Sequence, residues 1–213
     1  MIDLFSSSTT IHVGIILKGV GRGHDKGHNL KYQFVTLYRS LLRHNQKYNL
    51  HFVIMTDRPS VPYLDKIMSK FISRDSKKRG GPKVSYSFFD TSAITDAYNR
   101  AIVEMRPFFT SNSEAAMKYR DDLFMMGPFY HRVFPYELFI MLDADLKFRV
   151  DIAELYEHFH RFESEQIMGV AVDLAPHYRV AFRDFRERNP GTKVGEPGRF
   201  QASAVTNSSI VHT

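Results

Sequence analysis

The chain contains no cysteine and no tryptophan among its 213 residues. Without cysteine, disulfide bonds and thiolate metal sites are excluded, although the absence says nothing about the compartment. No run of about 18 apolar residues is present, so we expect no transmembrane helix in this chain. The first residues, Met1 to Ser8, lack the basic start and long apolar segment of a signal peptide, so we expect no secretory signal there.

Charge of one sign is not concentrated in any long segment. The formal net charge is +6, with basic residues scattered along the chain. The one dense cluster, Arg74 to Gly81, has the composition of a solvated loop. A nucleic-acid-binding module would gather Lys and Arg on one face, so that function stays as the weaker alternative, and we predict no nucleic-acid partner.

What the sequence does contain is an alternation of strand and helix patterns. Apolar, β-rich runs alternate with segments whose apolar residues recur at helical spacing. This alternation predicts an α/β fold with a mostly parallel sheet flanked by helices. Five strands are expected at 11–17, 50–55, 83–89, 138–142 and 167–172, the last of them buried, and helices at 34–42, 61–72, 96–105, 117–134 and 152–159.

Composition also suggests where the domain begins and ends. We expect a disordered N-terminus over residues 1–10 and a single domain over 11–201. From Asn189 onward the chain is rich in Pro, Gly, Ser and Thr, and no periodic element is visible. Residues 202–213 are therefore expected to form a disordered or divergent tail.

The strongest chemical signal is a pair of carboxylates at the end of an apolar run. Phe139 to Leu142 leads directly into Asp143 and Asp145, spaced i, i+2. Strands of α/β sheets end at the crevice where ligands bind. Carboxylate oxygens suit Mg²⁺ or Mn²⁺ and the phosphates that these ions carry. Asp-x-Asp at a strand end is typical of metal-dependent nucleotide-sugar glycosyltransferases.

Two other interpretations of this pair stay open at this point. The carboxylates could simply form a polar turn at the end of the strand. A phosphatase pattern would place Thr or Val two residues after the second Asp, and Lys147 stands there instead. The metal site is therefore the favoured interpretation of Asp143 and Asp145.

A glycine-rich loop, Gly19 to Gly27, follows the first expected strand. Phosphate-cradling loops occupy this place. However, His24 stands where the third glycine of a dinucleotide-binding loop belongs, and His28 stands where a P-loop needs lysine. The loop is therefore predicted to be a flexible surface loop and not a dinucleotide site, while Lys18, just before it, is a candidate for binding the cofactor.

Further carboxylates are candidates for the site. Asp121 and Asp122 lie near the start of an expected helix, where acids also stabilise the helix dipole. Asp173 ends the last expected strand and would face the same crevice as Asp143. None of the ten histidines shows a metal-binding spacing such as His-Glu-x-x-His.

Several longer segments together resemble one enzyme family. Residues 119–124, 143–148, 169–178 and 185–195 look like the xyloside α-1,3-xylosyltransferases of glycosyltransferase family 8, which also contains the glycogenin-like enzymes. Asp-x-Asp alone is weakly specific. The run Phe-Arg-x-x-Asn-Pro-x-Thr-x-Val-Gly that begins at Phe185 is far more specific. The likeness extends from about Ile11 to Gln201.

The resemblance implies a GT-A fold that uses UDP-xylose as donor and Mn²⁺, or alternatively Mg²⁺, as cofactor. It implies retaining transfer of xylose to a xylosyl-glucose O-glycan on EGF repeats of Notch-type proteins in the endoplasmic reticulum. The metal carboxylates of the family correspond to Asp143 and Asp145. Asp121 and Asp173 are the catalytic candidates, since both correspond to positions near the donor sugar.

The chain departs from the family after Gln201. The expected Gly-Phe-Asn-Ser-Gly turn, the acceptor-binding second half of the domain and its metal-ligating histidine do not follow, and His212 stands in no matching context. We therefore expect a C-terminally truncated form with little or no transfer activity. The alternative is a non-catalytic fragment that binds a nucleotide sugar or a protein. Because this chain shows no anchor or signal, a cytoplasmic location is the alternative to the endoplasmic reticulum.

Overall fold

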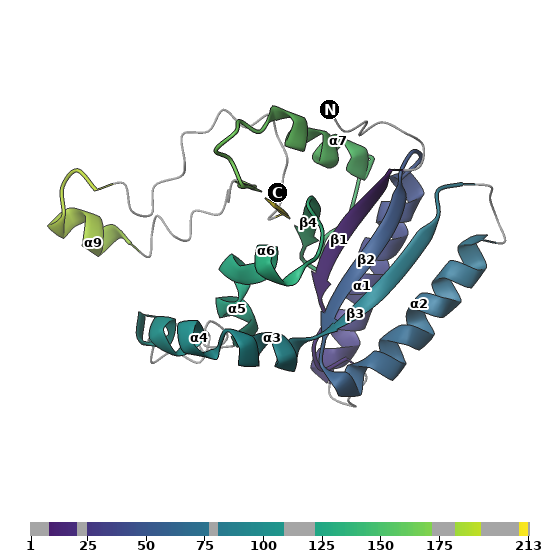
Figure 1. The fold of residues 1–213 in the computed structure, drawn as a ribbon, viewed down its shortest axis with the longest axis horizontal. Coiled ribbons are helices and arrows are strands. Elements are labelled where there is room, and N and C mark those ends of the chain that lie inside the picture. Colours follow the sequence, from purple (N-terminus) through teal and green to yellow (C-terminus); the bar gives the residue numbers. More distant parts are fainter. Residues whose placement is uncertain are drawn as a thin grey trace.

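The computed structural model describes residues 9–20, 25–76, 81–108, 122–171, 182–192 and 209–212. Within these residues the chain forms a six-stranded sheet in the order β3-β2-β1-β4-β6-β5, with helices packed beside it (Figure 1). The strands are β1 Thr10–Ile16, β2 Asn49–Thr56, β3 Val84–Asp90, β4 Phe139–Leu142, β5 Met168–Val170 and β6 Ser209–His212.

Four neighbouring strands of the sheet run in the same direction. β1 pairs in parallel with β2 on one side and with β4 on the other, and β3 extends the parallel sheet beyond β2. β6 then pairs antiparallel with both β4 and β5. The sheet is thus mostly parallel, as the strand–helix alternation predicted.

The helices vary from four residues to twenty. They are α1 Asp25–His44, α2 Val61–Ser76, α3 Thr91–Ala97, α4 Asn99–Met105, α5 Asp122–Met125, α6 Tyr130–Val133, α7 Ile152–Tyr156 and α9 Arg183–Arg188. Short 3₁₀ turns occupy Arg58–Ser60 (η1), Arg106–Phe108 (η2), Gly127–Phe129 (η4) and Glu157–Arg161 (η5). Among the described helices, none combines the length and the apolar character needed to cross a membrane.

Each face of the sheet has its own hydrophobic core. Phe52 and Ile54 of β2 point to the face covered by α1, α2 and α7, whereas Val53 and Met55 point to the face covered by α3 to α6 (Figure 1). Successive side chains of a strand alternate between faces, so one strand contributes to both cores. This two-sided burial explains why the central strands are almost continuously apolar.

Gly14 allows β1 and β4 to pack under the second core. A Cβ placed on Gly14 would lie 2.2 Å from the Met141 sulfur and 3.1 Å from the Phe134 ring. Both neighbours are buried. A larger residue here would displace the Met141 side chain, and glycine avoids this displacement.

The structure differs from the sequence-based expectations in the C-terminal part. The segment 167–172 was expected to be a buried strand, but β5 is short and exposed, and it lies at the sheet edge. The tail expected over 202–213 contains β6, whose backbone joins β4 to β5. Strand pairing of this kind depends on partners distant in sequence, so local composition did not indicate it.

Two helix boundaries also differ from expectation. α1 begins at Asp25, inside the segment Gly19 to Gly27 that was expected to be a loop. The single helix expected over 117–134 is divided, in its described part, into α5, η4 and α6. Gly127 and Pro128 stand at the division, and proline supplies no amide hydrogen to continue a helix.

Candidate functional site

The carboxyl ends of the four parallel strands share one edge of the sheet. Lys18 follows β1, Asp57 follows β2, Asp90 ends β3, and Asp143 follows β4. Ile15 of β1 lies opposite Leu142 of β4, so the chain leaves both strands side by side. This edge is where ligands bind in open α/β sheets.

The segment after β4 presents both predicted carboxylates outward. Asp143 and Asp145 are exposed, whereas Ala144 and Leu146 between and after them are partly buried against the first core. The alternation continues through Phe148, which also packs on that core. Ala144, between the two aspartates, therefore packs the segment against the first core, while both carboxylates stay accessible.

This segment is fixed at its far end as well. The Phe148 amide donates to the Ser40 hydroxyl oxygen on α1 at 2.9 Å, and Ser40 is buried. Asp151 accepts from the Ala153 amide at 2.9 Å and so caps α7. Its other carboxylate oxygen accepts from the Gln46 amide at 2.9 Å. A loop anchored in this way holds Asp143 and Asp145 near β4 without relying on a bound ligand.

The donor set at this place fits a hard divalent cation. Asp143 and Asp145 supply only oxygen atoms, which Mg²⁺ and Mn²⁺ prefer. Within the described part of the chain, no group of three or more His, Cys, Asp or Glu side chains is arranged to hold a metal. Two carboxylates are a number that Mg²⁺ sites in proteins commonly use.

In contrast to Asp143 and Asp145, another carboxylate at this edge is buried. Asp57, directly after β2, accepts a hydrogen bond from the Gly19 amide at 2.7 Å and another from the Ser60 hydroxyl at 2.7 Å. The Thr56 hydroxyl donates to the Leu17 carbonyl. The end of β2 thus holds the turn that follows β1.

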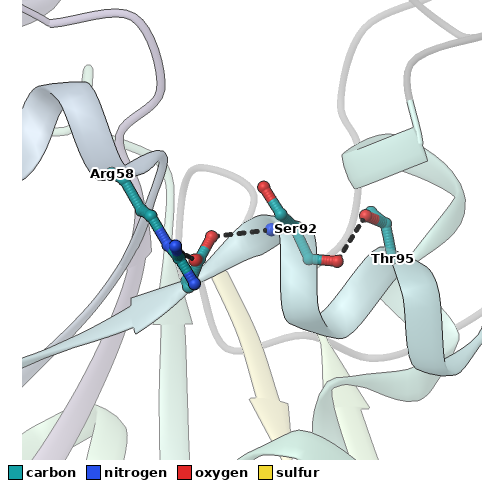
Figure 2. A network of polar contacts seen from close by, with 4 residues as sticks. Arg58, Ser92 and Thr95 are labelled. Atoms are coloured by element: carbon teal, nitrogen blue, oxygen red, sulfur yellow. Dashed lines mark hydrogen bonds and ion pairs between the residues drawn. The ribbon is translucent and has the colours of Figure 1, made fainter.

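A further carboxylate of this edge, Asp90, forms a surface network with Arg58 and α3 (Figure 2). Asp90 accepts from the Arg58 guanidinium at 2.6 Å and from the Ser92 amide at 2.9 Å, and Thr95 donates to the Ser92 carbonyl at 3.0 Å. The hydrogen bond from Arg58, followed by that from the Ser92 amide, lowers the pKa of the Asp90 carboxyl. Asp90 is therefore charged at neutral pH and caps α3.

Three of the predicted site residues meet at this edge. Lys18, Asp143 and Asp145 are all exposed there. Asp121 and Asp173, the two catalytic candidates, lie outside the described residues. His212 pairs with Phe139 at the start of β4, whereas Asp143 follows the end of that strand.

Asp57 and Asp90 were not singled out from the sequence as site residues. A signal was present, because each carboxylate stands at the end of an apolar strand pattern, as Asp143 does. The carboxyl ends of parallel strands share one edge, so the three positions belong together once the sheet is known to be parallel.

Known proteins with similar sequences are glycosyltransferases. Human xyloside xylosyltransferase 1 is 32% identical over 166 residues, covering 75% of this chain and 40% of that protein. The mouse protein of the same name is 34% identical over 119 residues, covering 55% of this chain and 30% of that protein. Zebrafish xylosyl- and glucuronyltransferase LARGE1 is 26% identical over 171 residues, covering 79% of this chain and 19% of that protein. No family model matches the chain.

The fold has a solved counterpart. The crystal structure of mouse xyloside xylosyltransferase 1 in its apo form matches with a TM-score of 0.72 at 22% identity, covering 96% of this chain and 67% of the solved chain. In the sequence alignments, the matched part of the chain corresponds to 40% of the human protein and 30% of the mouse protein, which is less than half of each. By sequence the chain is homologous to the xyloside xylosyltransferases, and it shares the fold of the solved mouse protein.

Proposed function

We propose that the chain carries the donor-binding part of a retaining, metal-dependent xylosyltransferase that uses UDP-xylose. The observation that carries this proposal is the pair Asp143 and Asp145, held outward at the end of a buried parallel strand in a chain homologous to xyloside xylosyltransferases. Mn²⁺, with Mg²⁺ as the alternative, is the ion that this pair would hold.

The choice of xylose as the sugar follows from the relatives. Human and mouse xyloside xylosyltransferase 1 and zebrafish LARGE1 are all named for xylosyl transfer, although LARGE1 is also named for glucuronyl transfer. The donor sugar common to these names is xylose. UDP-xylose is therefore the donor we propose.

The residues at this edge of the sheet would have different roles in donor binding. Asp143 and Asp145 would bind the ion through their oxygen atoms, and they remain outward because Ala144 and Phe148 pack on the core. The exposed Lys18 follows the neighbouring strand and supplies a positive charge for the diphosphate. The bound ion supplies neutralisation of the charge that develops on the diphosphate leaving group.

The acceptor and the compartment are further parts of the proposal. By family resemblance, the acceptor is a xylosyl-glucose O-glycan on EGF repeats, and the compartment is the endoplasmic reticulum. The chain spans 40% of the human relative, and we expect little or no transfer to this acceptor by the present residues alone. A radiolabelled UDP-xylose assay with a synthetic xylosyl-glucoside tests it directly.

Calorimetry with UDP tests donor binding. We expect UDP to bind in the presence of Mn²⁺ and to bind much more weakly after the ion is removed with a chelator. Asp143→Asn and Asp145→Asn should each weaken UDP binding by about tenfold or more in Mn²⁺, since one ion-binding charge is lost. The same variants should change UDP binding little in the absence of Mn²⁺.

A matched control is Asp65→Asn. Asp65 lies on α2, where it accepts a hydrogen bond from the Tyr86 hydroxyl at 2.7 Å, away from the carboxyl edge of β4. This change also removes one negative charge but should leave UDP affinity unaltered. Equal UDP affinity for the parent, Asp143→Asn and Asp145→Asn in Mn²⁺ would contradict the proposed metal bridge.

A further inference from the structure

Asp57 is the buried carboxylate at the carboxyl edge of the sheet, and donor binding as described above does not use it. The residue is 8% exposed, yet it belongs to a segment that leaves β2 at the edge shared by Lys18 and Asp143. One carboxylate oxygen accepts from both the Gly19 amide and the Ser60 hydroxyl, each at 2.7 Å. A buried polar side chain is tolerated when hydrogen bonds of this kind satisfy it.

The turn that Asp57 holds has an unusual backbone conformation. Gly19 has a φ of 74°, in the left-handed region that side chains disfavour. No heavy atom lies within 4 Å of a Cβ placed on Gly19, so the glycine is required by the backbone and not by crowding. The amide of Gly19 in this turn donates to the Asp57 carboxylate.

Thr56 and Asp57 act on the turn together. The Thr56 hydroxyl donates to the Leu17 carbonyl, and the Leu17 amide donates to the Met55 carbonyl at 2.9 Å. Leu17 is fully buried. Leu17 and Gly19, on either side of Lys18, are therefore both hydrogen-bonded to the end of β2. Lys18 itself is exposed.

The location of this turn connects it with the metal-binding carboxylates. β1 and β4 are adjacent, and Ile15 lies opposite Leu142 at their ends. The segment carrying Lys18 and the segment carrying Asp143 therefore leave the sheet side by side. A nucleotide diphosphate whose phosphates meet Asp143 through an ion would lie against the turn after β1.

We propose that Asp57 is a positioning residue for the donor nucleotide, which fixes the turn of Leu17 to Gly19 as a preformed wall of the UDP site. This role rests on the proposed function. A preformed turn avoids the ordering cost that a loose turn would add on binding. Asp57 itself contacts the turn and not the ligand.

The test combines UDP titration in Mn²⁺ with hydrogen exchange of the Gly19 amide. In Asp57→Ala we expect UDP to bind about tenfold more weakly and the Gly19 amide to lose its protection. Asp57→Asn keeps an acceptor oxygen for the Gly19 amide, so its UDP affinity should stay within about threefold of the parent. This partial rescue distinguishes positioning from a general loss of fold.

Ser60→Ala is the matched control. It removes the other hydrogen bond to the same Asp57 oxygen but leaves the bond from Gly19 in place. The free energy of unfolding of Ser60→Ala should fall, while its UDP affinity and the exchange protection of its Gly19 amide stay at parental values. If Asp57→Ala does not fold, Gly19→Ala replaces it, because that change strains the turn without any new contact.

The outcomes separate the two proposals. Parental UDP affinity in Asp57→Ala or in Gly19→Ala would overturn the positioning role and leave the proposed function intact. Equal loss of UDP affinity in Ser60→Ala would also overturn it, since stability alone would then explain the effect. Absence of Mn²⁺-dependent UDP binding by the parent chain would overturn the proposed function and this role with it.

Discussion

The apolar residues of the central strands β1, β2 and β4 are largely buried, whereas those of the described segment from β5 to α9 are exposed. Phe52 of β2 has no exposed surface, whereas Phe185 of α9 is 41% exposed. On β5 and just before it, Val170 is 62% and Ile167 is 69% exposed. No residue of α9 is buried.

The difference follows from how many layers cover each region. Strands β1, β2 and β4 contribute side chains to two cores, one on each face of the sheet. β5 lies at the end of the strand order and pairs with β6 alone among the described strands. Apolar sequence therefore favours a strand, but burial depends on which helices reach that strand.

The largest contrast should come from matched phenylalanine substitutions. Phe52→Ala should lower the free energy of unfolding by about 3–5 kcal/mol, because it leaves a cavity between α1 and the sheet. Phe185→Ala should lower it by less than about 1 kcal/mol, since its ring is already partly in water. Urea denaturation measures both; similar losses would show that α9 belongs to the same stable unit as β2.

Hydrogen exchange should extend this contrast to the backbone. We expect the amides of β2, which pairs on both sides, to exchange only through global unfolding. The amides of β5 should exchange at least about 100-fold faster, because few buried contacts oppose local opening there. Equal protection of β2 and β5 in the native protein would argue that both regions open together.

A third prediction concerns pH and the well-packed half of the sheet. His12 stacks on Tyr136 at a ring-centroid distance of 3.9 Å, and its ring lies 5.8 Å from that of His51, which bonds to the Ser85 and Ser87 hydroxyls. Desolvation, with repulsion from His51 as a smaller cause, lowers the pKa of His12. Desolvation also lowers the pKa of His51.

The sign of the pH effect follows from these shifts. Above the usual histidine pKa of about 6.5, both rings are neutral in the folded and unfolded chain, and their contribution is fully present. As pH falls below that value, the unfolded chain takes up protons first, so stability is lost. His12→Phe keeps the stacking on Tyr136 and should reduce the stability difference between pH 7.5 and pH 5.5; an unchanged difference would contradict the prediction.

The smallest effect is expected at the surface network of Figure 2. Arg58 is 88% exposed, and its hydrogen bond is the main cause of the lowered pKa of Asp90. A lowered carboxyl pKa stabilises the fold above the usual value of about 3.9, and this contribution is lost as pH falls below it. Arg58→Ala should therefore change the urea midpoint little at pH 7, and the change should shrink as pH falls below about 3.9. A difference that does not shrink would point to packing.

The sequence predicted the central part of the molecule well because local and long-range preferences agree there. The apolar run before Asp143 indicated a buried strand, and β4 is fully buried. The pattern over 61–72 indicated a helix that the structure extends to Ser76 as α2. Asp143 and Asp145 were singled out because their spacing is typical of a metal site, and their role stays a prediction.

Sequence alone thus determined the α/β class, the carboxylate pair and the resemblance to the xyloside xylosyltransferases, since each is written in neighbouring residues. Only the tertiary structure showed that β5 is exposed, that β6 joins it to β4, and that Asp57 holds Gly19 across 38 positions of sequence. These features depend on the order of strands in the sheet. Strand order is set by pairing energies summed over distant segments, which no short pattern contains.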